Sequence, residues 1–329
     1  MRIAIDAHGG DHAPFAVIEG VKMAAREWPD TTIVLVGCSD SILPESIPGI
    51  EFRQVTEIIE PEDEPVRSVR RKKDSSIVVG CQMVKEKKVD AFISGGNTGA
   101  LMAAGLFYTG RLPGVDRPAL APVLPTLSGK GILVLDVGAN PEARAEHLHQ
   151  YARLGSVYAE KVLGFDAPRI GLLNIGTEEG KGTELTKSAF ALFQADDAIR
   201  FMGNVEARDV LYGPCEVLVC DGYSGNILLK NTEGVAKAIF DRLKQELTAN
   251  LLNKLAAAIL KPGLKRFAKE MDYKEHGGAP LLGLAGPIIK AHGSSDATAF
   301  YNAIRQARRF VANNVIAQME EEFSRGRGE

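Results

Sequence analysis

Five glycine-rich turns in the sequence contain residue types that could hold an anion. The first follows a short apolar run at residues 91–93 and consists of Ser94, Gly95, Gly96, Asn97, Thr98 and Gly99. Glycine lets the backbone approach a ligand closely, and the N–H groups at the start of a following helix favour negative charge. We therefore predict that this turn binds an anion, phosphate above all.

Four later turns repeat the pattern. They occupy residues 136–140, 174–178, 221–226 and 292–296, and the first three of them follow an apolar strand pattern. Backbone N–H groups between Gly138 and Asn140 are candidates for a second part of the same phosphate site. Converging turns of this kind predict a site for a small anion.

The elements that must position these turns alternate between strands and helices. Apolar runs typical of buried strands occur at residues 2–6, 32–36, 90–94, 132–136, 169–174 and 216–220. Strands alternating with helices are typical of a mostly parallel, doubly wound α/β sheet, in which ligands bind beyond the carboxyl ends of strands. We expect residues 1–329 to form a single α/β domain of one or two lobes. A helix over residues 295–321 should close the chain.

Established nucleotide and nucleophile motifs are missing from the turns. No G-x-G-x-x-G follows a strand. Residues 176–183 resemble a Walker A loop, but they are one residue short between glycines and have Gly182 where Ser or Thr should hold magnesium. Residues 222–225 fall short of the G-x-S-x-G nucleophile elbow, and no cysteine lies in an obvious activating setting. These departures disfavour a nucleotide and an acyl-enzyme, and we expect no cofactor.

Two histidine pairs could be imagined as metal ligands. His8 and His12 lie near two aspartates, and His147 lies close to His149. A flexible glycine turn and the start of a surface helix explain these residues equally well, and no second ligand cluster accompanies them. We therefore expect no metal site.

A strongly charged segment precedes the first turn. An acidic run at residues 57–64 is followed by the basic residues Arg67, Arg70, Arg71, Lys72 and Lys73. A solvated surface helix would explain the pattern, and so would a docking patch for an acidic partner or a phosphate-bearing substrate. The sequence leaves both interpretations open.

Long helical patterns replace the alternation from about residue 226. Apolar residues recur at every fourth position from 239 to 259, residues 261–263 break the run, and residues 264–271 resume it. The basic residues Lys254, Lys261 and Lys265 accompany the apolar Leu260, Leu264 and Phe267. A protruding basic amphipathic helix pair at residues 235–271 suits a membrane surface, a partner helix or both, with core packing or a dimer interface as the alternative.

The composition gives no global bias toward nucleic acid. The 329 residues have a formal net charge of -3, and 45% of them are hydrophobic. The four cysteines form no C-x-x-C pair, which fits a reducing cytosol. The first residues predict a strand rather than a signal peptide, and no apolar run approaches the roughly 18 residues of a membrane span. We expect a cytoplasmic protein whose membrane contact is peripheral.

Seven segments, including SGGNTGA at residues 94–100 and KAHGSSD at residues 290–296, form a recognisable set. The others lie at residues 5–14, 63–73, 117–120, 135–140 and 203–209. Together they resemble the bacterial phosphate acyltransferases that start membrane phospholipid synthesis. The resemblance runs nearly end to end. It implies a fold similar to isopropylmalate dehydrogenase and phosphotransacetylase, and a cytosolic homodimer associated with the membrane surface.

The activity that the resemblance implies is transfer of a long-chain fatty acyl group from acyl carrier protein to inorganic phosphate. The product, acyl phosphate, would serve a later membrane acyltransferase. Phosphate is largely dianionic near neutral pH, so direct displacement requires no nucleophilic residue of the enzyme. Two alternatives stay open: a short-chain phosphotransacetylase that uses acyl-CoA, and a non-catalytic module that binds the carrier protein or lipid.

This chemistry gives the polar candidates expected roles. Lys181 would complete the phosphate site or stabilise the oxyanion. The candidates for orienting the reactants are Asp221, Asn226, His292 and Ser294. The basic residues 67–73 would dock the acidic carrier protein, and the helix pair would press its apolar side chains onto anionic lipid.

Overall fold

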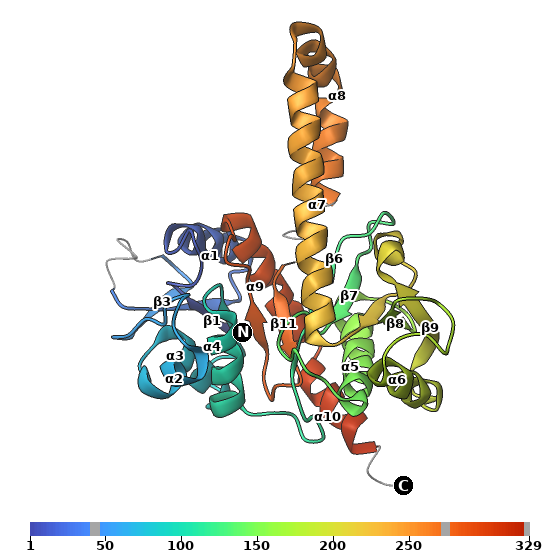
Figure 1. The fold of residues 1–329 in the computed structure, drawn as a ribbon. Coiled ribbons are helices and arrows are strands. Elements are labelled where there is room, and N and C mark those ends of the chain that lie inside the picture. The colour runs from blue at the N-terminus through green and yellow to red at the C-terminus, as the bar shows by residue number, and fades with distance from the viewer. Residues whose placement is uncertain (40–46, 271–276, 326–329) are drawn as a thin grey trace.

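Strands and helices alternate along the chain, and the strands form two sheets (Figure 1). This computed structural model describes residues 1–39, 47–270 and 277–325. Most neighbouring strands run parallel. The predicted class, a mostly parallel α/β fold, is therefore confirmed.

The larger sheet has the strand order β3-β2-β1-β4-β12-β11-β5. Within it, β11 runs antiparallel to both β12 and β5. The central strand β1 pairs with β2 and β4, and Ile3, Ala4 and Ile5 are fully buried, as expected for a strand covered on both faces. The strands of this sheet are β1 (Arg2–Asp6), β2 (Thr32–Gly37), β3 (Ile50–Gln54), β4 (Ala91–Ser94), β5 (Ala119–Leu120), β11 (Ala279–Leu282) and β12 (Ile288–Lys290).

The smaller sheet has the strand order β6-β7-β10-β8-β9, with β6 antiparallel to β7 at one edge. Its strands are β6 (Val123–Leu124), β7 (Ile132–Leu135), β8 (Arg169–Asn174), β9 (Arg200–Glu206) and β10 (Val217–Val219). The proline-rich segment 111–125 supplies β5 and β6, one edge strand for each sheet. Proline is tolerated at sheet edges because no ladder hydrogen bond from its nitrogen is needed there.

Helices cover both faces of the larger sheet. On one face, α1 and α9 pack together in an apolar cluster that includes Phe300. On the other face, α3 and α4 contribute to an apolar cluster that includes Leu101 and Phe92 and continues into the smaller sheet at Val134. These helices are α1 (Phe15–Glu27), α2 (Pro65–Arg71), α3 (Ser76–Lys85), α4 (Thr98–Ala104) with a π-helix at Gly105–Thr109, and α9 (Ala297–Ala312). One apolar core therefore joins the two sheets.

The smaller sheet packs against α5, which places Tyr151 fully buried beside Leu135 in a second cluster. Its flanking helices are α5 (Ala145–Tyr158), a π-helix at Ala159–Leu163, α6 (Glu184–Gln194), a 3-10 helix at Ala207–Tyr212 and α10 (Val315–Arg325). The prediction of one closing helix over residues 295–321 is wrong, because α9 ends at Ala312 and α10 begins at Val315. Asn314 between them has a φ of 51°, a left-handed conformation that ends an α-helix.

Two long helices, α7 (Gly222–Thr248) and α8 (Leu251–Glu270), extend away from both sheets (Figure 1). They turn at residues 249–250, not at residues 261–263 as the sequence pattern predicted. The Asn250 side chain accepts a hydrogen bond from the Asn253 N–H (2.8 Å), and Asn253 Nδ2 donates to the Glu246 carbonyl (2.8 Å), so asparagines satisfy both helix ends. Residue 271, the last of the predicted pair, lies outside the described residues.

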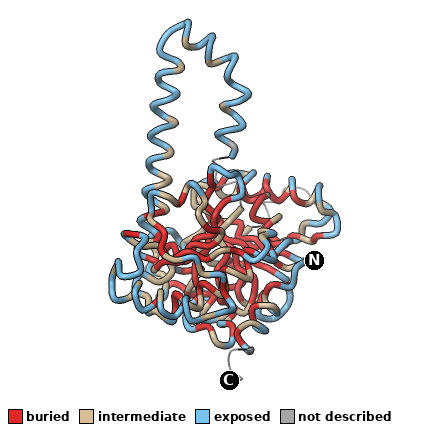
Figure 2. The backbone as a smooth tube through the Cα atoms, turned by 90° about the vertical axis from the view of Figure 1, so that its right-hand side faces the viewer, coloured by how far each residue is buried: buried red, intermediate tan, exposed pale blue. Residues whose placement is uncertain are grey.

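The proline that was expected to break the pair, Pro262, lies inside α8. A proline removes one backbone hydrogen bond, yet α8 continues through it while packing along α7. The outer part of the pair is exposed along its length (Figure 2). Among the described residues, no helix is long and apolar enough to cross a membrane.

Candidate active site

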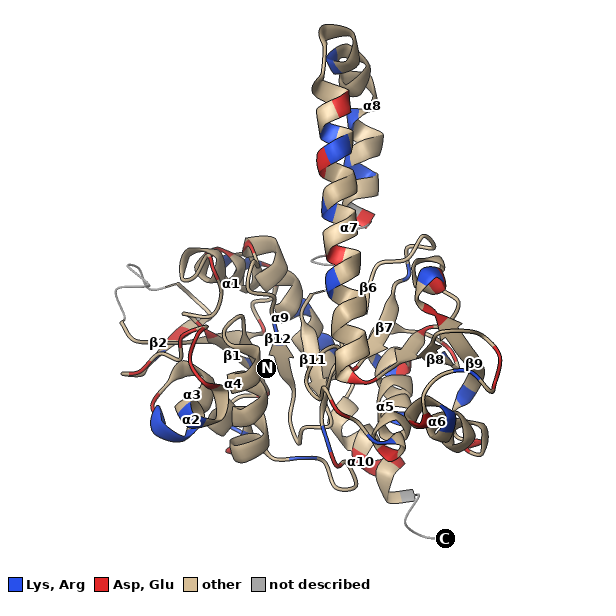
Figure 3. Cartoon of the chain, viewed as in Figure 1, with Lys and Arg blue, Asp and Glu red and all other residues tan. Residues whose placement is uncertain are grey.

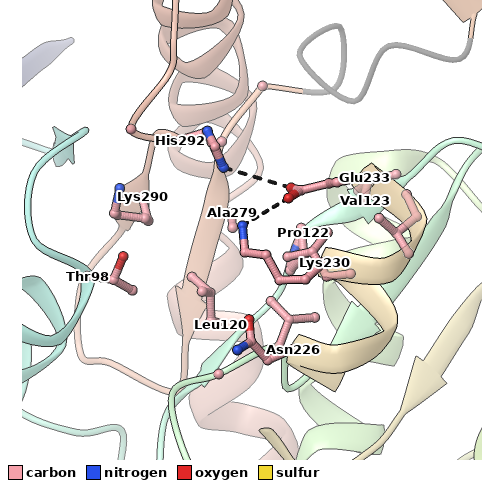
Figure 4. Close-up of a pocket in the computed structure, with 17 residues that line it drawn as sticks. Thr98, Leu120, Pro122, Val123, Asn226, Lys230, Glu233, Ala279, Lys290 and His292 are labelled. Carbon is pink, nitrogen blue, oxygen red and sulfur yellow. Dashed lines mark hydrogen bonds and ion pairs between the residues drawn. The ribbon is translucent and has the colours of Figure 1, made fainter. Parts of the chain in front are cut away.

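A cavity of about 370 Å³ opens where the carboxyl ends of β4, β7 and β12 meet the first turns of α7 (Figure 4). Four of the predicted site residues line it: Thr98, Gly138, Asn226 and His292. Three charged residues that the sequence analysis did not propose for the site line it as well: Lys230, Glu233 and Lys290. The sheet arrangement thus brings residues of four of the five glycine-rich turns to one cavity.

Buried hydrogen bonds of Ser94 hold the first turn. Ser94 Oγ donates to the Asp6 carboxylate (2.7 Å) and accepts the Gly96 N–H (3.0 Å), and Ser94 is fully buried. A side chain on Gly95 would lie 2.5 Å from the Gly9 carbonyl oxygen, so the close approach of the two loops requires glycine. Ser94 therefore shapes the turn from the inside.

The other end of this turn begins α4. Asn97 Oδ1 accepts the Ala100 N–H (3.0 Å), and Asn97 Nδ2 donates to the carbonyls of Pro61 (3.0 Å) and Asp63 (3.1 Å). Asn97 is thus an N-cap that also ties the acidic loop to the turn. Thr98 is the residue of this turn that lines the cavity.

The second turn is organised around the fully buried Asp136. Its Oδ1 accepts N–H groups from Leu120 (3.0 Å), Gly138 (3.2 Å) and Ala139 (3.0 Å). Its Oδ2 accepts the Asn140 N–H (2.7 Å) and Asn140 Nδ2 (3.0 Å). Asn140 is therefore engaged in holding the turn, and Gly138, with a φ of 133°, is the part that faces the cavity.

The turn at residues 221–226 starts α7. Asp221 is its N-cap, since Oδ1 accepts the Ser224 N–H (2.9 Å) and Oδ2 accepts Ser224 Oγ (2.8 Å). A Cβ on Gly225 would lie 1.9 Å from the Asp136 carbonyl oxygen, so this turn of the helix packs directly on the second glycine-rich turn. That packing places Asn226 beside Gly138 at the cavity wall.

His292 follows β12 and lies half-buried in the cavity. Its Nδ1 accepts the Ser294 N–H (3.1 Å) and lies 2.9 Å from Ser294 Oγ, while Nε2 lies 3.8 Å from Glu233 Oε1. Burial lowers the pKa of His292; the Glu233 carboxylate opposes this shift, and the neighbouring Lys230 and Lys290 add to it. A neutral imidazole whose Nδ1 accepts a backbone N–H has its proton on Nε2, so His292 presents a donor toward the cavity.

The charged residues from α7 complete one wall. Lys230 Nζ lies 2.9 Å from Glu233 Oε2, and the same carboxylate faces His292 (Figure 4). Thr98 and Lys290 lie across the cavity from them in this view. Residues 226, 230 and 233 of α7 lie three and four positions apart and so share one face of the helix. That spacing was the sequence signal that could have identified Lys230 and Glu233 as site residues.

Lys181 lies on the turn after β8 and does not line this cavity. The residue is exposed, and its backbone carbonyl accepts a hydrogen bond from Asn174 Nδ2 (3.1 Å). Its role in phosphate or oxyanion binding stays a prediction from the sequence.

The cysteine thiols and possible metal-ligand clusters were considered as further parts of the site. Burial raises the pKa of Cys215 to about 12 and raises the pKa values of Cys81 and Cys220 above their usual range. Such thiols are poor nucleophiles, because the thiolate is the reactive form. Within residues 1–39, 47–270 and 277–325, no group of three or more His, Cys, Asp or Glu side chains could hold a metal ion.

Some known proteins are similar to this chain in sequence, and others are similar to it in fold. A family model described as "Fatty acid synthesis protein" matches residues 1–318. The phosphate acyltransferase of Brevibacillus brevis is 59% identical and covers 100% of both chains, and that of Geobacillus thermodenitrificans is 56% identical over 99% of both. A phosphotransacetylase structure from Streptococcus pyogenes has a TM-score of 0.60 at 16% identity, covering 95% of this chain and 94% of its own, which shows the shared fold. The chain therefore belongs to the phosphate acyltransferase family of fatty acid synthesis proteins.

Proposed function

We propose that this enzyme transfers a long-chain acyl group from acyl carrier protein to inorganic phosphate by direct displacement. The observation that supports the proposal is the cavity itself, where Gly138, Asn226, Lys230, Lys290 and His292 meet. The Asn226 amide, the two lysines and the His292 imidazole suit an anion beside a polarised carbonyl, and Glu233 in the same wall pairs with Lys230.

In this reaction a phosphate oxygen attacks the thioester carbonyl carbon, and the carbon–sulfur bond breaks as the tetrahedral intermediate collapses. The leaving sulfur takes up the proton that hydrogen phosphate loses once it is acylated. The Nε2–H of His292 can donate to the developing oxyanion, and the turns hold phosphate against the carbonyl. The enzyme needs no nucleophile of its own, which fits the buried thiols of Cys81, Cys215 and Cys220.

The test is phosphate-dependent release of free carrier thiol by the purified protein. Long-chain acyl carrier protein should support turnover, and acetyl-CoA should not. Turnover with acetyl-CoA alone would point to a short-chain phosphotransacetylase. Binding of acyl carrier protein without turnover, unchanged in Lys181→Ala, would point to a non-catalytic binding module.

For docking of the carrier protein we propose the exposed basic face of α2, visible in Figure 3. Lys72 does not contribute freely, because its Nζ is paired with Asp63 (2.5 Å) and donates to the Ile58 carbonyl (2.7 Å). The exposed basic residues are Arg67, Arg70, Arg71 and Lys73. Pro65 at the start of α2 lies against Gly99, since a Cβ there would be 2.6 Å from Pro65 Cγ, so the patch adjoins the first turn.

For the helix pair we propose peripheral contact with an anionic membrane surface on the cytoplasmic side. Around its outer end, Leu252, Ile259 and Leu260 are exposed by 78%, 81% and 56%. Lys254, Lys261 and Lys265 are exposed beside them and could attract anionic lipid. Leu264 and Phe267 contribute less, because Leu264 is half-buried and the Phe267 ring lies 5.9 Å from the Phe240 ring on α7.

The remaining apolar surface of α7 supports a homodimer as a further part of the proposal. Val235 and Ile239 are exposed by 48% and 61%, closer to the body of the protein than the lysines of α8.

An acyl phosphate formed near a membrane could pass directly to a downstream membrane acyltransferase. Light scattering of the purified protein tests the dimer.

A further inference from the structure

Lys290, the last residue of β12, lies beneath the first glycine-rich turn. Its side chain is 7% exposed, and its Nζ donates to the carbonyls of Gly95 (3.1 Å) and Ala291. The Gly95–Gly96 peptide is thus held at both ends, because its N–H donates to Ser94 Oγ (3.0 Å) while its carbonyl accepts from Lys290. One buried cation fixes the orientation of the turn.

Backbone carbonyl oxygens hold this buried cation. Within the described part of the chain, Lys290 forms no ion pair with a carboxylate, and its partners are neutral carbonyls. Buried charges are normally paired or bind an ion, because desolvation is costly. Since Lys290 also lines the cavity, an anion in the cavity would supply the missing negative charge.

The surroundings of Lys290 determine when it is charged. Burial lowers its pKa to about 8, opposed by the carboxylates of Asp6 and Asp11 and reinforced by Lys230. The charged and titratable groups around it come from β1 and its following loop, from α7 and from the loop after β12: Asp6, Asp11, Lys230, Glu233 and His292.

We propose that Lys290 is the phosphate-positioning residue of this enzyme: its ammonium orients the Gly95–Gly96 peptide and supplies the charge that pairs with phosphate in the cavity. The inference rests on the proposed function for the identity of the anion. A hydrocarbon side chain of similar length would fill the same space without a desolvation cost, so packing alone does not account for a lysine here.

The experiment measures the Michaelis constant for phosphate from pH 6.5 to 9.5 in phosphate-dependent thiol release. In the wild type it should rise above about pH 8 as Lys290 loses its proton. In Lys290→Met it should be about ten- to hundredfold higher at pH 7 and show no rise near pH 8, with the constant for acyl carrier protein unchanged. Lys290→Arg should keep a low constant and remove the rise, because guanidinium stays charged.

Lys88→Met is the matched control, since Lys88 is an exposed lysine whose side chain is 65% accessible. A wild-type phosphate constant that stays flat from pH 7 to 9.5 would overturn the inference without any variant. An unchanged constant and pH profile in Lys290→Met would do the same.

Direct binding separates this inference from the proposed function. Inorganic phosphate should raise the thermal unfolding midpoint of the wild type at pH 7 more than at pH 9.5, and that difference should vanish in Lys290→Met. If thiol release fails but the pH-dependent phosphate shift is present, the proposed function is wrong and Lys290 still binds phosphate. If thiol release succeeds but the phosphate shift is equal at both pH values, Lys290 has no such role.

Discussion

Replacing Lys290 by methionine should stabilise the protein at pH 7 while it weakens phosphate binding. The pKa of Lys290 is lowered from 10.5 to about 8 by burial. Each pKa unit corresponds to about 1.4 kcal/mol, so burial of the charge costs about 3 kcal/mol. Methionine removes that cost but leaves the carbonyls of Gly95 and Ala291 without a donor, at about 1 kcal/mol each. The free energy of unfolding should therefore increase by about 1 kcal/mol.

The pH dependence gives the sharper test. Because the folded pKa lies below the unfolded value, the unfolded state binds more protons at Lys290 between about pH 8 and 10.5, and wild-type stability rises with pH in this window. Relative to Lys290→Met, the wild type should gain about 2.5 kcal/mol between pH 7 and pH 10, which reverses the order of stability.

Urea unfolding of both proteins at the two pH values measures this change, provided that the denaturant slopes agree. Titrating groups that do not interact with Lys290 act equally on both proteins and cancel in the difference, and the lowered pKa of His292 lies below this pH range. Lys88→Met, which removes an exposed charge, should show no such change. If the difference between wild type and Lys290→Met is the same at pH 7 and pH 10, Lys290 does not titrate as a buried amine and the reasoning fails.

Three further predictions concern other parts of the molecule. Gly225→Ala should destabilise the protein by about 3 kcal/mol, because its Cβ would meet a carbonyl oxygen at 1.9 Å. Gly234→Ala on the same helix, with nothing within 4 Å of the added Cβ, should stabilise the protein slightly. Equal thermal unfolding midpoints for the two variants would refute this. Reversing the charges of Arg70 and Arg71 should raise the Michaelis constant for acyl carrier protein about tenfold and leave that for phosphate unchanged; an unaffected carrier constant would exclude this dock. Leu260→Glu should lower binding to anionic liposomes at least about tenfold in a flotation assay, and wild-type protein that fails to float would rule out the membrane contact.

Much of the fold could be predicted because its signals are local. Buried parallel strands such as β7 are continuous apolar runs, and a glycine-rich turn directly after such a run marks the end of the strand. The turn between α7 and α8 was also encoded locally, in the capping side chains of Asn250 and Asn253, although the hydrophobic period concealed it. The short strands β11 and β12 had no such signal, since three or four apolar residues are equally compatible with a helix or a loop.

The sequence by itself determined the family, the class of fold and the turns that could bind an anion. Tertiary structure decided which polar residues face the cavity and which support the backbone: Asn97 and Asp221 became helix caps, while Asn226 reached the cavity wall. It also brought Lys290 to the Gly95 carbonyl, 195 residues away in sequence. The physical reason is that helix capping and ligand binding use the same side-chain donors and acceptors. Only the packing of distant strands determines which of these groups point into the cavity.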